Sequence, residues 1–129
     1  MAVQLNHTIV NVLDPEGSAR FLSELLGLPA PYPFGPFFVV ELANGVSLDF
    51  IVASADELIV EHYAFLVDES EFDAIFERIR TRGLPYWADP AKRQANAINH
   101  HDGGRGVYWE DPNGHMLEII TRPYGSGAA

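Results

Sequence analysis

The chain has 129 residues, 47% of them hydrophobic and 20% charged, which suits a globular domain with a buried core. Eighteen acidic and eight basic side chains give a formal charge of −10, so the surface repels nucleic-acid phosphates and anionic lipids. The absence of cysteine excludes disulfides and thiolate chemistry. Since the chain opens without a signal-peptide pattern and holds no apolar run near the ~18 residues of a membrane span, we expect a cytoplasmic protein.

The first predicted elements are a strand over residues 6–12 and a helix that ends before Gly27. Asp14 is placed to cap this helix, with Pro15 at its first position. Further along, Asn44-Gly45 separates two apolar segments, 37–42 and 46–52, and predicts a hairpin. The short connection over residues 53–60 joins this half to the next.

The second half begins with a strand over residues 61–67 and a helix capped by Asp68 or Ser70. Its apolar stripe has helical spacing and stops at Gly83; the stripe consists of Phe72, Ile75, Phe76 and Ile79. Residues 86–105 predict one irregular strand and a mobile flap.

A second hairpin is predicted around the turn Asp111-Pro112-Asn113-Gly114. His115 adjoins this turn and is expected at the surface. Residues 124–129 are expected to form a frayed tail.

The chain contains an internal repeat. His7 and His62 are 55 positions apart, and each lies in a strand that precedes a helix. At an offset of 69, Asn44-Gly45 matches Asn113-Gly114 and Asp49 matches Glu118. Each half therefore reads as a strand with a histidine, a helix, a loop and a hairpin with an acid.

The alternation of strand side chains places these polar residues on one face and a uniformly apolar set on the other. An acid in mid-strand is costly to bury without a partner. Two imidazoles and two carboxylates at repeat-related positions suggest a shared divalent cation, and Zn, Fe(II), Ni or Mn would suit these ligands.

The chain resembles the vicinal oxygen chelate superfamily from Leu5 to about Arg122, most specifically in the stretch Gly106–Glu118, GVYWEDPNGHMLE. The resemblance implies an α+β fold in which two βαβββ modules, residues 4–53 and 60–122 of one domain spanning 1–129, form a curled mixed sheet around a metal cup. It implies that His7, His62 and Glu118 are the metal ligands.

Within the superfamily, the stretch Asn99–Gly106 resembles small single-domain Fe(II) dioxygenases of the chartreusin-biosynthesis type. The implied catalytic residues are Tyr108 as a hydrogen-bond donor and His100 or His101 as a proton shuttle. Substrate contacts are predicted for Asp49, Asn11, Trp109 and Arg105. Asp49 stands where glyoxalase members carry a ligating Glu, and because Asp is one methylene shorter, a water-mediated or supporting role is the alternative.

The favoured function is O2-dependent oxidation or cleavage of a catechol-like or hydroxylated aromatic substrate at Fe(II), with Mn, Ni or Zn as alternative metals. Several aromatic residues are candidates for the wall of an apolar pocket: Tyr32, Phe34, Phe37, Tyr86 and Trp87. The alternatives are a glyoxalase-like isomerase, a fosfomycin-type thiol transferase, and a metal-free drug-binding resistance protein.

A homodimer is expected, because two curled half-sheets in a chain this short leave exposed edges. By resemblance, the modules are swapped between subunits. His7 of one chain would then join His62 and Glu118 of the other.

Overall fold

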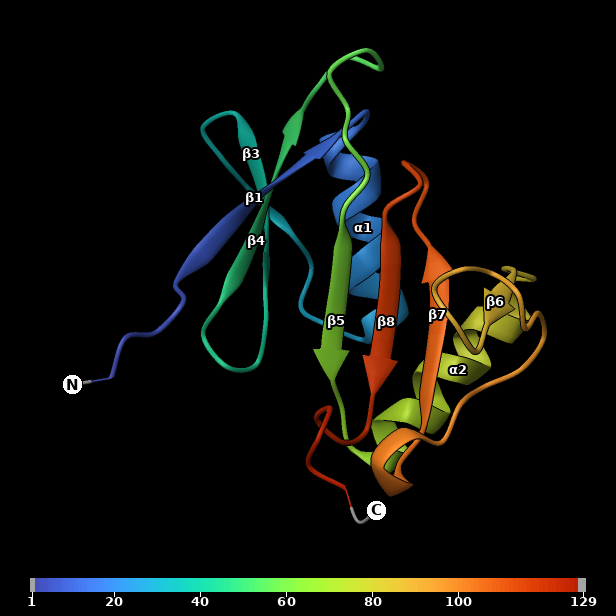
Figure 1. The fold of residues 1–129 in the computed structure, drawn as a ribbon. Helices are drawn as coiled ribbons and strands as arrows, with labels where there is room; N and C mark the ends of the chain where they lie inside the picture. Colours follow the sequence, from blue (N-terminus) through green and yellow to red (C-terminus); the bar gives the residue numbers. More distant parts are fainter. Residues whose placement is uncertain (1, 128–129) are drawn as a thin grey trace. The chain divides into compact units, whose positions relative to one another are not determined.

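The computed structural model describes residues 2–127. The chain divides into two compact units, Met1–Ile59 and Val60–Ala129. Each unit consists of one helix and a four-stranded mixed sheet (Figure 1). The predicted α+β fold with two βαβββ modules is therefore confirmed.

The first unit consists of β1 (His7–Val12), α1 (Pro15–Leu26), β2 (Tyr32–Phe34), β3 (Phe37–Glu41) and β4 (Ser47–Val52). Its strands lie in the order β1-β4-β3-β2. The strand β4 pairs in parallel with β1 and antiparallel with β3, so the last strand of the module is central to its sheet.

Local signals at both ends of α1 act as predicted. The Asp14 carboxylate accepts a hydrogen bond from the Gly17 backbone N–H at 3.2 Å, and Pro15 opens the helix. Gly27 ends it with φ 71°, a left-handed conformation that glycine adopts without steric cost. The helix lies on one face of the sheet and contacts β1, β3 and β4.

The second unit repeats this topology. Its elements are β5 (His62–Leu66), α2 (Glu69–Thr81), β6 (Tyr86–Trp87), a short 3-10 helix (His101–Gly103), β7 (Gly106–Glu110) and β8 (Met116–Ile120). The strand order is β5-β8-β7-β6, with β5 parallel to the central strand β8. Both sheets thus share the arrangement that the sequence repeat implies.

Asp68, rather than Ser70, caps α2. Its carboxylate accepts from the Glu71 N–H at 2.7 Å, and the Glu71 side chain accepts from the Asp68 N–H at 2.9 Å. This reciprocal pair is a capping box. The stripe on α2 is buried at Phe72 and Ile75, as its spacing predicts.

Strand alternation holds in the first unit. On β1, His7, Ile9 and Asn11 are exposed, whereas Val10 and Val12 are buried. The polar face of this strand therefore lies opposite the face that packs on α1.

Two expectations are wrong. His115 was expected at the surface but is only 1% exposed. Its Nδ1 accepts a hydrogen bond from the backbone N–H of Glu61, 54 residues earlier, at 2.9 Å, and this contact accompanies its burial. The expected frayed tail is ordered over residues 124–127, where Gly125 and Gly127 donate backbone hydrogen bonds to Asp102. The rest of that expectation, residues 128–129, lies outside the described residues.

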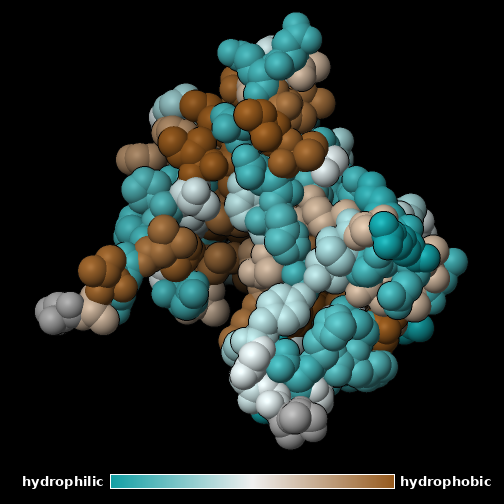
Figure 2. Space-filling view, in the orientation of Figure 1, coloured by the Kyte–Doolittle hydropathy of each residue, from teal (hydrophilic) through white to brown (hydrophobic). Residues whose placement is uncertain are grey.

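Hydrophobic surface gathers where β4 runs into the connection to β5 (Figure 2), and Val52 and Ile59 are 65% and 71% exposed there. Neither helix of the described chain has the length and apolar character needed to cross a membrane.

The Asp68→Ala variant is expected to lower the melting temperature at pH 7 by about 4 °C, because a capping bond is lost. Backbone and side-chain hydrogen bonds lower the pKa of Asp68 below its usual 3.8. The stabilisation is therefore present above pH 3.8 and is lost as the pH falls through the lowered value. Thermal melts from pH 2 to 8 measure this, with Asp56→Ala as a control. If the melting temperature of Asp68→Ala differed from that of wild type by the same amount at every pH, the capping role of the ionised Asp68 carboxylate would be contradicted.

Candidate functional site

The predicted metal ligands are divided between the two units. His7 opens β1 in the first unit, whereas His62 on β5 and Glu118 on β8 belong to the second. Among residues 2–127, no group of three or more His, Asp or Glu side chains is arranged to hold a metal ion. Each unit is therefore considered by itself.

Glu118 is the least exposed charged side chain among the described residues of the second unit. It lies on the central strand β8, opposite Ala64 on β5 and Tyr108 on β7, and it is 0% exposed. A buried carboxylate requires hydrogen bonds or a positive partner. Its Oε1 lies 3.0 Å from Nε2 of His62, and its Oε2 accepts a short hydrogen bond from the Tyr124 hydroxyl.

The hydrogen bonds of His62 define its tautomer. Its Nδ1 lies 3.0 Å from the Met116 carbonyl oxygen, which can only accept, so Nδ1 carries the proton. In the neutral ring, Nε2 then presents a lone pair toward Glu118. Two electron-rich atoms at 3.0 Å repel each other unless a proton or cation lies between them. This donor set fits a divalent metal.

Two tyrosine hydroxyls extend the cluster. The Tyr108 and Tyr124 oxygens are 2.9 Å apart, and the Tyr108 ring stacks on His62 with centroids 5.9 Å apart. Burial raises the pKa of the Tyr108 hydroxyl, and its bond to Tyr124 raises it further. Burial and then the bond to Glu118 raise the pKa of Tyr124. Both hydroxyls therefore stay protonated near neutral pH and can donate.

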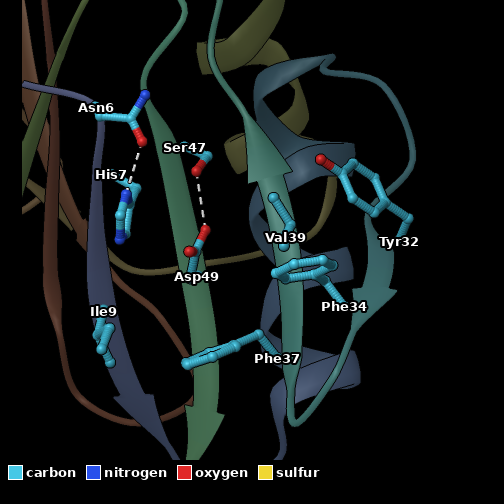
Figure 3. A pocket seen from close by; sticks show the side chains of 9 residues that line it. All are labelled: Asn6, His7, Ile9, Tyr32, Phe34, Phe37, Val39, Ser47 and Asp49. Carbon is cyan, nitrogen blue, oxygen red and sulfur yellow. Dashed lines mark hydrogen bonds between the residues drawn. The ribbon is translucent and has the colours of Figure 1, made fainter.

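His7 lies in an open pocket of the first unit (Figure 3). Its Nδ1 is 2.7 Å from the amide oxygen Oδ1 of Asn6, so Nδ1 donates and Nε2 keeps its lone pair, as in His62. Asp49 points from the adjacent strand into the same pocket and accepts a hydrogen bond from the Ser47 hydroxyl at 2.9 Å. The imidazole and the carboxylate thus share one face of the sheet.

Aromatic side chains line the rest of this pocket. Tyr32 and Phe34 come from β2 and Phe37 from β3 (Figure 3). The pocket encloses about 380 Å³, within the usual size range of small-molecule sites. An aromatic wall facing a carboxylate and an imidazole suits a flat ring that carries hydroxyl groups.

Tyr86 and Trp87 do not line this pocket. They form β6 of the second unit, where Tyr86 packs edge-on against Phe76 at 5.0 Å and Lys92 lies over the Trp87 ring at 5.3 Å. Their rings contact α2 and the following loop, and their backbones pair with β7.

The predicted substrate contacts are spread over several surfaces. Asn11 shares the exposed face of β1 with His7. Trp109 is 0% exposed on the face of β7 opposite Tyr108, and its indole N–H has no hydrogen-bond partner among residues 2–127. Arg105 pairs with two carboxylates of α2, Glu69 at 2.7 Å and Asp73 at 2.9 Å.

The two histidines of the loop have different surroundings. His100 is exposed directly before the 3-10 helix. His101 lies beside Tyr124, with ring centroids 6.3 Å apart, and so adjoins the hydroxyl that reaches Glu118. His101 is therefore the shuttle candidate that contacts the cluster through Tyr124.

Sequence reasoning missed Tyr124. Its signal is an aromatic residue between Pro123 and Gly125, a turn sequence six positions after Glu118. Gly125 has φ 79°, which turns the chain back toward β8.

Known proteins share the sequence and the fold of this chain. Two solved structures, titled Oxidase ChaP-H1 and Oxidase ChaP-H2, are 63% and 60% identical, with TM-scores of 0.93 and 0.95. The matches cover 96% and 99% of this chain and 99% and 100% of those chains. The glutathione transferase FosA of Serratia marcescens is 28% identical over 126 residues, which cover 92% of this chain and 81% of that protein.

A family model described as the Glyoxalase/Bleomycin resistance protein/Dioxygenase superfamily matches residues 4–119. This match spans both βαβββ modules and includes His7, His62 and Glu118. The chain belongs to the Glyoxalase/Bleomycin resistance protein/Dioxygenase superfamily.

Proposed function

We propose that the chain is a metal-dependent dioxygenase that uses Fe(II) to oxidise or cleave a catechol-like or hydroxylated aromatic substrate of the polyketide type. The observation that carries the proposal is the position of His62 Nε2 at 3.0 Å from the buried Glu118 carboxylate, which places two metal-ligand atoms side by side. The similarity to two proteins titled oxidases over nearly the whole chain supports the type of reaction.

In this proposal His7, His62 and Glu118 hold the metal. A divalent metal with open positions would bind two adjacent substrate oxygens, lower their pKa values and admit O2. The oxidant is O2, and both of its oxygen atoms enter the product as a ring carbon–carbon bond breaks.

The residues of the chain bind and orient the substrate. The aromatic wall formed by Phe34 and Phe37 stacks on the flat ring. Asp49 accepts from a substrate hydroxyl, and His101 exchanges protons with solvent because it is exposed. Tyr108 turns its hydroxyl proton from Tyr124 to a substrate oxygen when substrate binds.

A homodimer with swapped modules would bring together ligands that are divided between the two units. His7 of one chain would then meet His62 and Glu118 of its partner. The hydrophobic surface that includes Val52 and Ile59 supports an interface, because exposed apolar patches usually mark contact sites.

The second candidate is thiol transfer of the fosfomycin type, favoured by the similarity to the Serratia marcescens glutathione transferase. It would use the same metal ligands, but with a thiol co-substrate in place of O2. A metal-free drug-binding protein remains the third alternative.

The metal assignment is tested by anaerobic loading with Fe(II), followed by metal analysis. We expect about one metal per wild-type chain, and at least a 10-fold loss of affinity in His62→Ala, because one of three protein ligands is gone. His100→Ala is the matched control and should keep its metal. A wild-type chain without bound metal after loading with Fe(II) or Mn(II) would favour the drug-binding alternative.

The reaction type is tested with an oxygen electrode. The Fe(II)-loaded chain should consume about one O2 per molecule of a polycyclic catechol, since both oxygen atoms enter the product. Turnover of fosfomycin and glutathione without oxygen uptake would instead establish thiol transfer. The His62→Ala chain is the negative control for both assays.

The shared site is tested by co-expressing His7→Ala and His62→Ala chains. Each variant alone makes only defective sites. In a swapped dimer, one of the two sites of every mixed dimer is intact, so random pairing should restore metal at about one quarter of all sites. Metal analysis of the mixture measures this. A mixture that stays as metal-poor as either variant alone would place the whole ligand set within one chain.

A further inference from the structure

The C-terminal segment Pro123–Gly127 is fastened to the loop that precedes β7. The Asp102 carboxylate accepts from the Gly125 N–H at 3.1 and 3.2 Å and from the Gly127 N–H at 3.1 Å. The two backbones lie so close that a Cβ on Gly127 would overlap the backbone of Asp102. The path of this segment is therefore set by a specific contact.

This path brings Tyr124 to the site from the surface. The residue is 55% exposed, yet its hydroxyl reaches Oε2 of Glu118, a residue with no exposed surface. On its other side the ring adjoins His101, which opens the same 3-10 helix that contains Asp102. The loop thus supports Tyr124 through both the backbone and the ring.

Counting protons fixes the direction of the hydrogen bonds. Tyr124 has one hydroxyl proton and donates it to Glu118, so the bond between the hydroxyls must be donated by Tyr108. Oε2 of Glu118 is then occupied, and Oε1 is the oxygen that faces Nε2 of His62 at 3.0 Å.

We infer that Tyr124 is a positioning residue for the metal site: its hydroxyl occupies Oε2 of Glu118 and leaves Oε1, beside His62, as the single oxygen directed at a bound cation. The inference rests on the proposed role of Glu118 as a metal ligand. Groups that orient a ligating carboxylate commonly set the metal affinity, because the ligand otherwise rotates among several positions.

The experiment is a titration of the full-length chain with Co(II), whose visible absorption spectrum reports the number and geometry of its ligands. Tyr124→Phe removes the hydroxyl and keeps the ring. Asp102→Ala keeps the Tyr108 and Tyr124 hydroxyls but removes the carboxylate that holds the segment Pro123–Gly127. Tyr63→Phe is the control, since Tyr63 lies on the face of β5 opposite His62 and contacts His115. Thermal melts of each variant report on folding.

Wild type and Tyr63→Phe should bind about one Co(II) per chain with the same spectrum. Tyr124→Phe and Asp102→Ala should bind it about 10-fold or more weakly and with an altered spectrum, because Glu118 is free to rotate. Wild-type affinity and spectrum in both variants would overturn the inference while leaving the metal assignment standing. Failure of wild type to bind Co(II) would overturn the metal assignment and the inference with it.

Discussion

The buried carboxylate of Glu118 is the constraint on which the arrangement of polar side chains in the second unit depends. Glu118 has no exposed surface and lies on a central strand whose neighbours Leu117 and Ile119 are buried too. A charge in such a place must be surrounded by donors or cations. The hydroxyl of Tyr124 donates to one oxygen of Glu118, and Nε2 of His62 lies 3.0 Å from the other, where a proton or a bound cation completes the pairing. His62 is held by the Met116 carbonyl, and the segment that carries Tyr124 is held by Asp102. The 3-10 helix with Asp102 and the C-terminal segment with Tyr124 together bring a hydroxyl to Glu118.

The two modules share a topology but have diverged in chemistry. Asp49 and Glu118 occupy matching places on the central strands β4 and β8. Asp49 is partly exposed beside a pocket with aromatic walls and is partnered by Ser47. Glu118 is enclosed in a hydrogen-bonded cluster. One half of the repeat therefore offers room for a ligand, and the other offers a rigid set of donor atoms.

Helix ends and tight turns, which depend on residues adjacent in the sequence, were predictable from the sequence. Asp14 and Gly27 mark the ends of α1, and Asn44-Gly45 marks the first hairpin, because caps and tight turns depend on a few adjacent positions. The internal repeat extended these signals to the second hairpin, formed by β7 and β8. Contacts between distant segments were not predictable in this way. Arg105 pairs with Glu69, 36 positions earlier, and Tyr124 is placed by Asp102.

The central position of β4 and β8 also bears on how the chain folds as it is synthesised. Each is the last strand of its module, and each joins the first strand to the remaining two. The first sheet can close once Val52 has left the ribosome, whereas β5 has no neighbour until β8 emerges at residues 116–120. The pairing of β5 thus waits for more than fifty residues, and such long loop closures slow folding. During that interval both edges of β5 lack a partner strand, and an unpaired strand edge is where one chain can pair with another.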